Sequence, residues 1–314
     1  MRDDIKIIDL DLEMKDESAK AVALGNFDGI HKGHQKLMRE NIKIAKEKGL
    51  VPSVLLFKEN TRETLNKKID YLTSLDDKIE ILADLGIKCF LIIHFDDKFR
   101  SMNPYKFIKE ILHNKLNAKY ITVGSDYRFG DKASGNIDTL REYEDEFSYK
   151  TQVVDFAKTN GEKISSRTIR QLIKDGKIKE ANEFLDRSYR IKGKVVHGYK
   201  RGRELNFPTA NLDPSFSYCI PKDGVYLTKL TVHGKSHYAL TNIGTNPTFE
   251  NLERKVETYI LDFDEYIYDE DISIDFLEFF RGDFKFSSVD ELIEQMEKDK
   301  KMAYDAIKNR AAAK

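Results

Sequence analysis

The chain has 314 residues, which exceeds the usual size of a single domain and predicts two domains, each with its own core. Charged residues make up 34% of the sequence, apolar residues 40%, and the formal net charge is −1. This balance argues against general nucleic-acid binding, which needs a basic surface. Since no apolar run approaches the roughly 20 residues that cross a bilayer, we expect no membrane segment.

The cysteines and the N-terminus indicate the compartment. Cys89 and Cys219 are the only cysteines, and neither belongs to a CxxC pair or a disulfide framework, which is typical of a reducing compartment. Met1 to Ile5 lack the long apolar segment of a secretory signal. We therefore expect a cytoplasmic protein.

The first half of the chain alternates between apolar runs and amphipathic segments. We expect strands at 21–24, 53–57, 89–93 and 120–123, and helices that begin at Gln35, Asp76 and Pro104. Ser74 with Asp77 resembles a capping box, and Gly86 follows the last turn of the second helix. The alternation predicts a parallel sheet covered by helices.

The run 25–34, Gly-Asn-Phe-Asp-Gly-Ile-His-Lys-Gly-His, joins the first strand to the first helix. At a helix start, unpaired N–H groups and the helix dipole favour an anion, and the three glycines, Gly25, Gly29 and Gly33, allow a close approach to phosphate. His31 and His34 add donors where a transferring phosphate gains charge. The alternatives are half of a metal site or polar residues in a turn, but no third ligand lies at zinc spacing nearby.

Two further segments are expected to meet this turn, because ligands in open parallel sheets bind beyond the carboxyl ends of the strands. Gly124 to Gly130 follows the strand that ends at Val123, and Ile164 to Arg170 opens a helix that Gly176 ends. Each is ambiguous alone: the first could be an ordinary turn, and the second a capped surface helix with solvated arginines.

After about Leu185 the pattern changes to short segments rich in β-branched and aromatic residues, separated by turn signals, which predicts an antiparallel β domain. Ser288 to Lys308 then shows a helical pattern with Ser288 as its cap and an apolar stripe of Leu292, Ile293 and Met296. We expect two domains, residues 1–185 and 186–314, with the boundary resting on this change of pattern.

The β-rich half carries a second phosphate-type motif. The loop 193–203 is rich in glycine and basic residues and could wrap ATP phosphates. Thr209 and Asn211 supply a hydroxyl and a carbonyl, hard oxygen ligands suited to Mg²⁺, on one side of an extended strand. Alone, a Thr-x-Asn pair is more typical of hydrogen bonding in a turn or at a strand end.

Taken together, these motifs resemble the bifunctional bacterial riboflavin kinase/FMN adenylyltransferase family, also called FAD synthetase, from about residue 20 to residue 305. The resemblance implies an α/β plus β fold: a Rossmann-like nucleotidyltransferase domain with a parallel sheet, then a small antiparallel β-barrel kinase domain with a C-terminal helix. It implies ATP-dependent phosphorylation of riboflavin to FMN and adenylylation of FMN to FAD with release of pyrophosphate. The implied partners are riboflavin, FMN and ATP, with Mg²⁺ as cofactor.

The same resemblance assigns roles to residues. The implied catalytic residues are Glu257, as the base that accepts the riboflavin 5′-hydroxyl proton, and His31, His34, Ser166 and Arg170. Nucleotide-binding positions are Gly25, Phe27, Asp28, Gly29, Gly33, Gly193, Lys194, His197 and Lys200. Flavin-binding positions are Asp126, Arg128 and Arg281, and the metal ligands are Thr209 and Asn211. Without the resemblance, Glu257 would be interpreted as a solvated strand residue paired with Arg254 or Lys255.

Three segments depart from the family pattern. Lys58 to Thr61 replace a Pro-His-Pro turn, Arg167 occupies the third position of a serine-rich motif, and Asp283 stands where Glu is usual. One alternative is therefore a riboflavin kinase only, with the N-terminal domain a non-catalytic flavin- or nucleotide-binding module. Another is an interaction or RNA-binding protein, which the balanced charge argues against.

Overall fold

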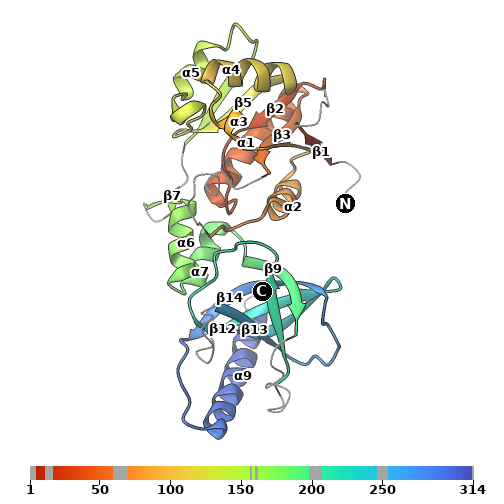
Figure 1. Cartoon of the computed structure of the whole chain (residues 1–314), viewed down its shortest axis with the longest axis vertical. Coiled ribbons are helices and arrows are strands. Elements are labelled where there is room, and N and C mark those ends of the chain that lie inside the picture. The colour runs from red at the N-terminus through yellow and green to blue at the C-terminus, as the bar shows by residue number, and fades with distance from the viewer. Residues whose placement is uncertain are drawn as a thin grey trace. The chain divides into compact units, whose positions relative to one another are not determined.

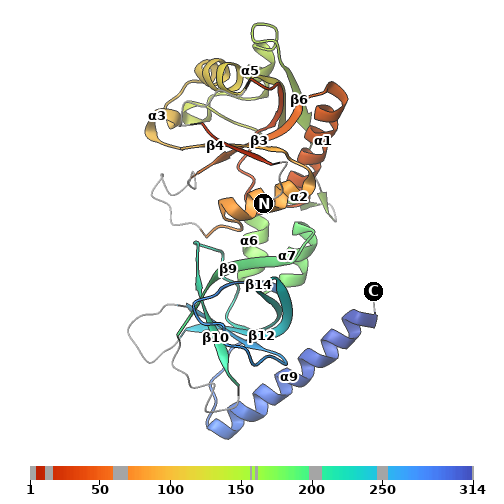
Figure 2. The same ribbon diagram turned by 90° about the vertical axis from the view of Figure 1, so that its right-hand side faces the viewer.

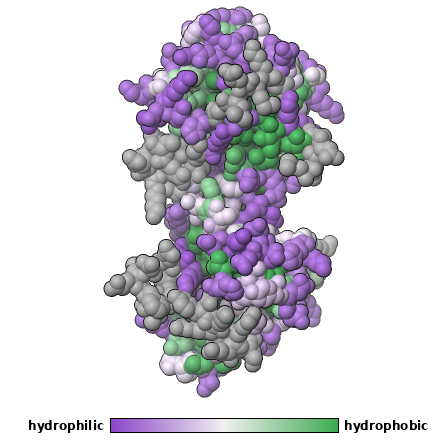
Figure 3. Space-filling model, turned by 45° about the vertical axis from the view of Figure 1, so that its right-hand side comes forward, coloured by the Kyte–Doolittle hydropathy of each residue, from purple (hydrophilic) through white to green (hydrophobic). Residues whose placement is uncertain are grey.

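The computed structural model describes residues 5–10, 17–58, 70–155, 158–159, 162–197, 207–245 and 254–312. The chain forms two compact units, Met1–Ser166 and Arg167–Lys314, and each is described by itself. Figure 1 shows a sheet with helices in the first unit and a β-barrel in the second, which confirms the predicted α/β plus β combination. The face in Figure 3 is mostly hydrophilic, with a hydrophobic patch on the first unit.

Six parallel strands form the sheet of the first unit, in the order β1-β4-β3-β2-β5-β6. They are β1 (Lys6–Asp9), β2 (Lys20–Ala23), β3 (Val51–Phe57), β4 (Cys89–Ile93), β5 (Ala118–Gly124) and β6 (Lys150–Val154). Every residue of β4 is buried, as expected for an apolar strand that is covered on both faces. A small hairpin, β7 (Lys158–Thr159) and β8 (Glu162–Lys163), follows the sheet.

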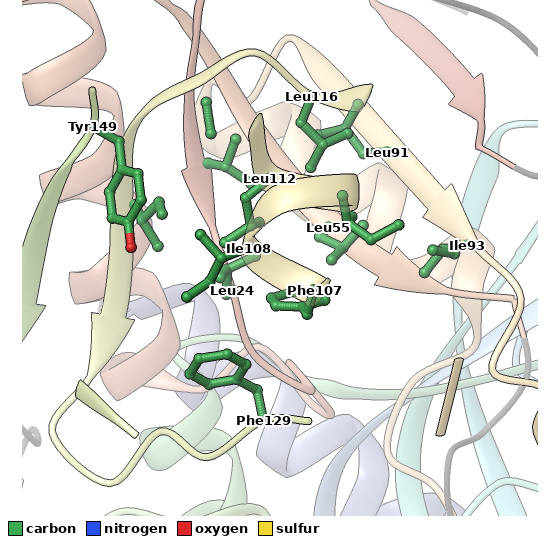
Figure 4. Close-up of a cluster of buried hydrophobic side chains, with 14 of the residues drawn as sticks. Leu24, Leu55, Leu91, Ile93, Phe107, Ile108, Leu112, Leu116, Phe129 and Tyr149 are labelled. Atoms are coloured by element: carbon green, nitrogen blue, oxygen red, sulfur yellow. The ribbon is translucent and has the colours of Figure 1, made fainter. Parts of the chain in front are cut away.

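Helices cover both faces of the sheet, because alternate strand residues point to opposite sides. Val54 of β3 packs with α1 (Lys32–Lys48) and α2 (Leu75–Leu85). Leu55 points the other way, toward the π-helix η2 (Phe107–Lys115), in the cluster drawn in Figure 4. The remaining short helices are α3 (Asp97–Arg100), α4 (Pro104–Lys106), η3 (Asp131–Ala133) and α5 (Ile137–Glu142).

The first unit confirms the predicted strands and helices, with differences in detail. α1 begins at Lys32, three residues before the predicted start, and Ser74 and Asp77 form the expected capping box of α2. The helix predicted from Pro104 holds α-geometry for three residues and then widens into η2. β1, β6, α3 and α5 were not predicted, because they are short segments without strong periodicity.

The second unit is a closed antiparallel barrel in the order β10-β13-β12-β11-β14-β9, preceded by two helices. The helices are α6 (Ser166–Lys174), which Gly176 ends as predicted, and α7 (Ile178–Leu185). The strands are β9 (Tyr189–Val196), β10 (Thr209–Pro214), β11 (Gly224–Val232), β12 (Lys235–Thr245), β13 (Arg254–Ile260) and β14 (Asp271–Arg281). Closure leaves the barrel without a free edge.

The C-terminal helix α9 (Val289–Ala312) lies on the outside of the barrel, as Figure 2 shows. Its N-terminus is capped as predicted, since the Glu291 N–H donates to the Ser288 hydroxyl. The contact with the barrel is made by Ala303 and Ile307, whereas the predicted stripe at Leu292 is only half-buried.

Gly193 permits the close approach of β9 and β10. A Cβ at this position would lie 2.1 Å from the Asp213 carbonyl oxygen and 2.8 Å from a Leu212 methyl group. We expect Gly193→Ala to destabilise the second unit by at least the roughly 1–3 kcal/mol of an overpacked core, measured by denaturant unfolding. Gly282→Ala is the control, since no atom lies within 4 Å of its Cβ position. Equal effects of the two substitutions would contradict this reading.

Candidate active sites

The strand order of the first unit reverses direction between β2 and β5. β3 lies on one side of β2 and β5 on the other, so the order reverses at this pair. The Leu24 N–H donates to the Thr122 carbonyl at 3.0 Å, which joins the two strands at their carboxyl ends. The run 25–34, which we call the phosphate turn after its predicted role, therefore leaves the sheet beside the loop that begins at Gly124. A switch point of this kind is where open α/β sheets bind ligands.

The turn between β2 and α1 has an unusual backbone. Phe27, Gly29 and Ile30 have φ angles of 47°, 81° and 40°. These angles lie in the left-handed region of backbone conformation, which residues other than glycine rarely adopt. Gly25 is required for a different reason: a Cβ there would lie 2.8 Å from the Phe27 ring. Gly33 lies inside α1 with an ordinary φ, so of the three predicted glycines only Gly29 supplies a left-handed turn.

His31 and His34 lie at the start of α1, as predicted. His31 is the N-cap, and its Nδ1 accepts the His34 N–H at 3.4 Å. The two imidazole rings stack at 3.7 Å, and the edge of Phe27 meets His34 at 5.4 Å. Nδ1 of His31 is the acceptor of this hydrogen bond, which favours the neutral tautomer with its proton on Nε2.

Asp28 and Ser166 hold the turn from within the first unit. The buried Asp28 carboxylate accepts the N–H groups of Leu72 and Thr73 at 2.9 and 3.2 Å, and the Thr73 hydroxyl at 3.3 Å. The Ser166 hydroxyl donates to the Asp28 carbonyl at 2.8 Å. Ser166 is thus next to the phosphate turn, whereas Arg170 belongs to the second unit.

The loop after β5 turns its aromatic side chains inward and its charged ones outward. Asp126 and Arg128 are exposed, while Tyr127 stacks on the buried Phe129 at 5.6 Å. Burial raises the pKa of the Tyr127 hydroxyl. Phe129 also meets Phe107 of η2 at 5.3 Å, as Figure 4 illustrates.

This contact extends into an aromatic cluster at the carboxyl ends of β3 and β4. Phe57 lies 5.1 Å from Phe95 and 5.7 Å from Phe99, and Phe99 lies 5.9 Å from Phe107. Phe57, Phe95 and Phe99 are half-buried, which leaves part of each ring exposed. No motif in the sequence marks these rings as one cluster, because they come from separate segments that only the fold brings together.

The departures from the family pattern fall partly within the structure. The Lys58 ammonium group pairs with the Asp9 carboxylate at 2.7 Å, so its side chain reaches across β4 toward β1, on the opposite side of β3 from the phosphate turn. Arg167 is exposed. Glu59, Asn60 and Thr61 lie outside the described residues.

In the barrel, the predicted base and metal ligands stand side by side. Asn211 of β10 is directly opposite Glu257 of β13, which in turn is opposite Asn242 of β12. Thr209, two residues from Asn211, shares its face of β10, and all four side chains are partly exposed. Sequence reasoning missed Asn242, whose place in this row depends on the pairing register.

A chain of buried hydroxyls runs behind this row. Thr228 of β11, Thr241 of β12 and Thr258 of β13 are fully buried. The Thr241 Oγ1 lies 2.8 Å from that of Thr228 and 3.0 Å from that of Thr258. Thr228 donates to the Ala239 carbonyl at 3.2 Å, so every hydroxyl in the chain has an acceptor. Because a slip of one residue would turn these groups outward, the chain helps fix the register that aligns Asn242 with Glu257.

The predicted nucleotide-binding residues Gly193, Lys194 and His197 lie in the last part of β9 and just after its end. Gly193 is explained by the close approach of β10, and Lys194 is exposed. His197 stacks on Tyr268 at 4.3 Å. Lys200 and the rest of the loop 198–203 lie outside the described residues.

Arg281, the third predicted flavin-binding residue, joins β14 to α9. Its Nε and one terminal nitrogen donate to the Asp299 carboxylate at 3.0 and 2.7 Å, and Gln295 donates to the same carboxylate at 2.8 Å. The guanidinium group lies over the Phe284 ring, 4.6 Å from its centre. Asp299 is only 2% exposed and the Arg281 side chain is 18% exposed, so the carboxylate is buried and the guanidinium group is largely buried.

We expect Asp299→Ala to destabilise the second unit by about 3–5 kcal/mol, because Arg281 would keep a buried charge without its carboxylate. The matched control is Glu294→Ala, which breaks an exposed pair with Lys298 on the same helix and should cost about 1 kcal/mol or less. Denaturant unfolding of both variants measures the difference. Similar losses would show that the Arg281 pair is not energetically special.

The donors near Glu257 suit a hard cation. The Thr209 hydroxyl, the Asn211 carbonyl and the Glu257 carboxylate are oxygen ligands of the type that Mg²⁺ prefers. Within the described ranges, groups of three or more His, Cys, Asp or Glu side chains in metal-binding arrangement do not occur. The Thr209 and Asn211 oxygens would suit Mg²⁺ as ligands beside the Glu257 carboxylate.

The first unit has a phosphate turn at the switch point of a parallel sheet. The second unit is a barrel with hard oxygen donors beside a carboxylate. Together these features define a two-domain transferase that acts on phosphate groups. Two family models divide the chain along the same lines. FAD synthetase matches residues 13–168, and riboflavin kinase matches residues 185–307.

Curated relatives carry both activities in their names. The bifunctional riboflavin kinase/FMN adenylyltransferase of Listeria monocytogenes is 40% identical over 89% of this chain and 90% of its own length. That of Bacillus subtilis is 36% identical over 94% of this chain and 95% of its own length. The chain belongs to the family of bifunctional riboflavin kinases/FMN adenylyltransferases.

A solved structure agrees in fold over nearly the whole chain. A crystal structure from Streptococcus pneumoniae, titled macrolide-efflux protein, has a TM-score of 0.87 at 32% identity and covers 96% of this chain and 99% of its own. Its title differs from the relatives' names, and the two family models favour the flavin assignment. In the part of the chain that the structure describes, no helix has the length and apolar character of a membrane span.

Proposed function

We propose that this chain makes FAD from riboflavin in two steps, with the kinase reaction in the barrel and adenylyl transfer in the α/β unit. The observation that carries the proposal is the tandem match to both family models, in chain order, with a candidate site in each matched segment. The kinase match begins at residue 185, beside our proposed boundary between residues 185 and 186, whereas the FAD synthetase match ends at residue 168 and the compact units divide after Ser166. Cys89 and Cys219 are buried and form no disulfide, which supports a cytoplasmic location.

In the barrel, Glu257 accepts the proton of the riboflavin 5′-hydroxyl as that oxygen attacks the γ-phosphorus of ATP, and ADP leaves. Thr209 and Asn211 would hold Mg²⁺ beside this carboxylate. Bound there, the ion would neutralise charge on the phosphate oxygens. Asn242 borders Glu257 on the opposite side and orients the base by packing or hydrogen bonding.

In the α/β unit, an oxygen of the FMN phosphate attacks the α-phosphorus of ATP, and pyrophosphate leaves. This reaction needs no protein nucleophile, so the residues act by positioning and by stabilising charge. The start of α1, the Nε2–H of His31 and the imidazole of His34 do so at the phosphates. The half-buried rings of Phe57, Phe95 and Phe99 offer exposed surface for the isoalloxazine, in the same unit as Asp126 and Arg128.

The purified chain incubated with ATP and Mg²⁺, with either riboflavin or FMN as the starting flavin, tests both steps. We expect FMN and then FAD from riboflavin, and FAD from FMN, when the flavins are separated over time. FMN accumulation without FAD in either reaction would instead support the kinase-only alternative.

A further inference from the structure

The phosphate turn is held in a conformation that its own residues do not favour. Phe27 and Ile30 are left-handed at φ angles of 47° and 40°, and Ile30 is β-branched, which makes such an angle a genuine outlier. Backbone strain of this kind persists only where surrounding groups enforce it. The groups that enforce it are therefore part of the site.

Those groups come mainly from the segment that leads into α2. The Thr73 hydroxyl accepts the Gly29 N–H at 2.9 Å and donates to Asp28. Lys78, in the second turn of α2, donates from its ammonium group to the Asn26 carbonyl at 3.2 Å. Hydrogen bonds thus hold the turn on both sides of Phe27: Lys78 bonds to the Asn26 carbonyl, and Thr73 bonds to the Gly29 N–H.

Burying the charged Lys78 side chain at this position is energetically unfavourable. Its side chain is 7% exposed, and lysine is almost never fully buried unless it is paired. Burial lowers the pKa of its ammonium group, and the Asp28 carboxylate acts in the opposite sense. A cation near the N-terminus of a helix is also unfavourable toward the helix dipole. Stability alone therefore does not account for a lysine here.

We infer that Lys78 is a positioning residue for adenylyl transfer: by holding the Asn26 carbonyl, it keeps the strained turn in the shape that presents His31 and the start of α1 to the ATP phosphates. Its charge also faces that of Asp28, so the turn carries less uncompensated negative charge beneath a bound anion. This inference rests on the proposed adenylyl transfer and adds a residue that does not itself touch the reacting atoms.

The test is Lys78→Met, which keeps length and apolar bulk but removes the ammonium group, with the exposed Lys46→Met of α1 as its matched control. We expect kcat for FAD formation from FMN to fall at least tenfold in Lys78→Met and to stay unchanged in Lys46→Met. FMN formation from riboflavin, catalysed in the other unit of the same molecule, should be unaffected in both. Thermal unfolding shows whether the first unit remains folded at the assay temperature.

A folded Lys78→Met with wild-type kcat overturns the inference, and so does a loss of rate that only follows the unfolded fraction. If the methionine variant does not fold, Lys78→Gln, which remains polar but is shorter than lysine, takes its place with the same expected loss. A wild-type chain that makes no FAD from FMN refutes adenylyl transfer itself, which distinguishes that failure from the failure of the inference alone.

Discussion

Glu257→Gln is expected to slow the conversion of riboflavin to FMN by about 10²–10⁴, the usual contribution of a general base. Glutamine preserves the size of the side chain and its place opposite Asn211 and Asn242, but it cannot accept the 5′-hydroxyl proton. The barrel should therefore remain folded. Initial rates of FMN formation at saturating riboflavin and ATP measure the effect.

Two controls sharpen this prediction. Glu270→Gln changes an exposed glutamate of the same unit that pairs with His233 at 3.0 Å, and it should leave kinase turnover unchanged. Formation of FAD from added FMN should be unchanged in Glu257→Gln as well. Undiminished kinase turnover in Glu257→Gln would remove this residue from the role of base.

His31→Asn is expected to slow the formation of FAD from FMN by about 10²–10³, the typical cost of removing one donor to developing charge. Asparagine is among the best N-cap residues, so the variant deletes the Nε2–H while keeping a cap for α1. The stability of the first unit should thus change little. Steady-state rates with FMN as the starting flavin, together with thermal unfolding, separate the two effects.

A second substitution at the same position tests the structural half of that argument. His31→Ala removes the imidazole and the cap together, so it should lose the same rate and also about 1 kcal/mol of stability. His113→Asn, a histidine that contacts the Phe147 carbonyl at 3.2 Å, is the control for a general effect of the substitution. Wild-type FAD formation by His31→Asn would show that the imidazole does not act on the reacting phosphates.

Local signals in the sequence predicted much of the fold. The strand predicted from the apolar run at Cys89–Ile93 is β4, with the same bounds. The capping box predicted from Ser74 and Asp77 is present at the start of α2. The four residues of β1 were missed because an isolated edge strand has too few positions to show alternation. The widening of the helix after Lys106 into η2 also leaves no mark in an apolar period, since its buried residues still form one face.

The candidate sites were predictable where a motif is continuous in sequence and not where the fold assembles it. His31 and His34 follow directly from the turn, whereas Asn242 reaches Glu257 only through the register of β12 and β13. Two predicted glycines also have steric roles that the sequence did not indicate: Gly25 makes room for the Phe27 ring, and Gly193 makes room for the neighbouring strand β10. Steric contacts of this kind depend on partners that are distant in the chain.

The central claim, that one chain holds two separate sites for successive reactions, is tested most directly by mixing two defective variants. With riboflavin, ATP and Mg²⁺, and over the time in which the wild-type chain completes the conversion, Glu257→Gln alone should leave nearly all riboflavin unconverted, because its kinase step is slowed by about 10²–10⁴. His31→Asn alone should accumulate FMN. A mixture of the two should form FAD, because FMN released by one is adenylylated by the other. Formation of FAD from riboflavin by Glu257→Gln alone at the wild-type rate, or a mixture that stops at FMN, would contradict the account.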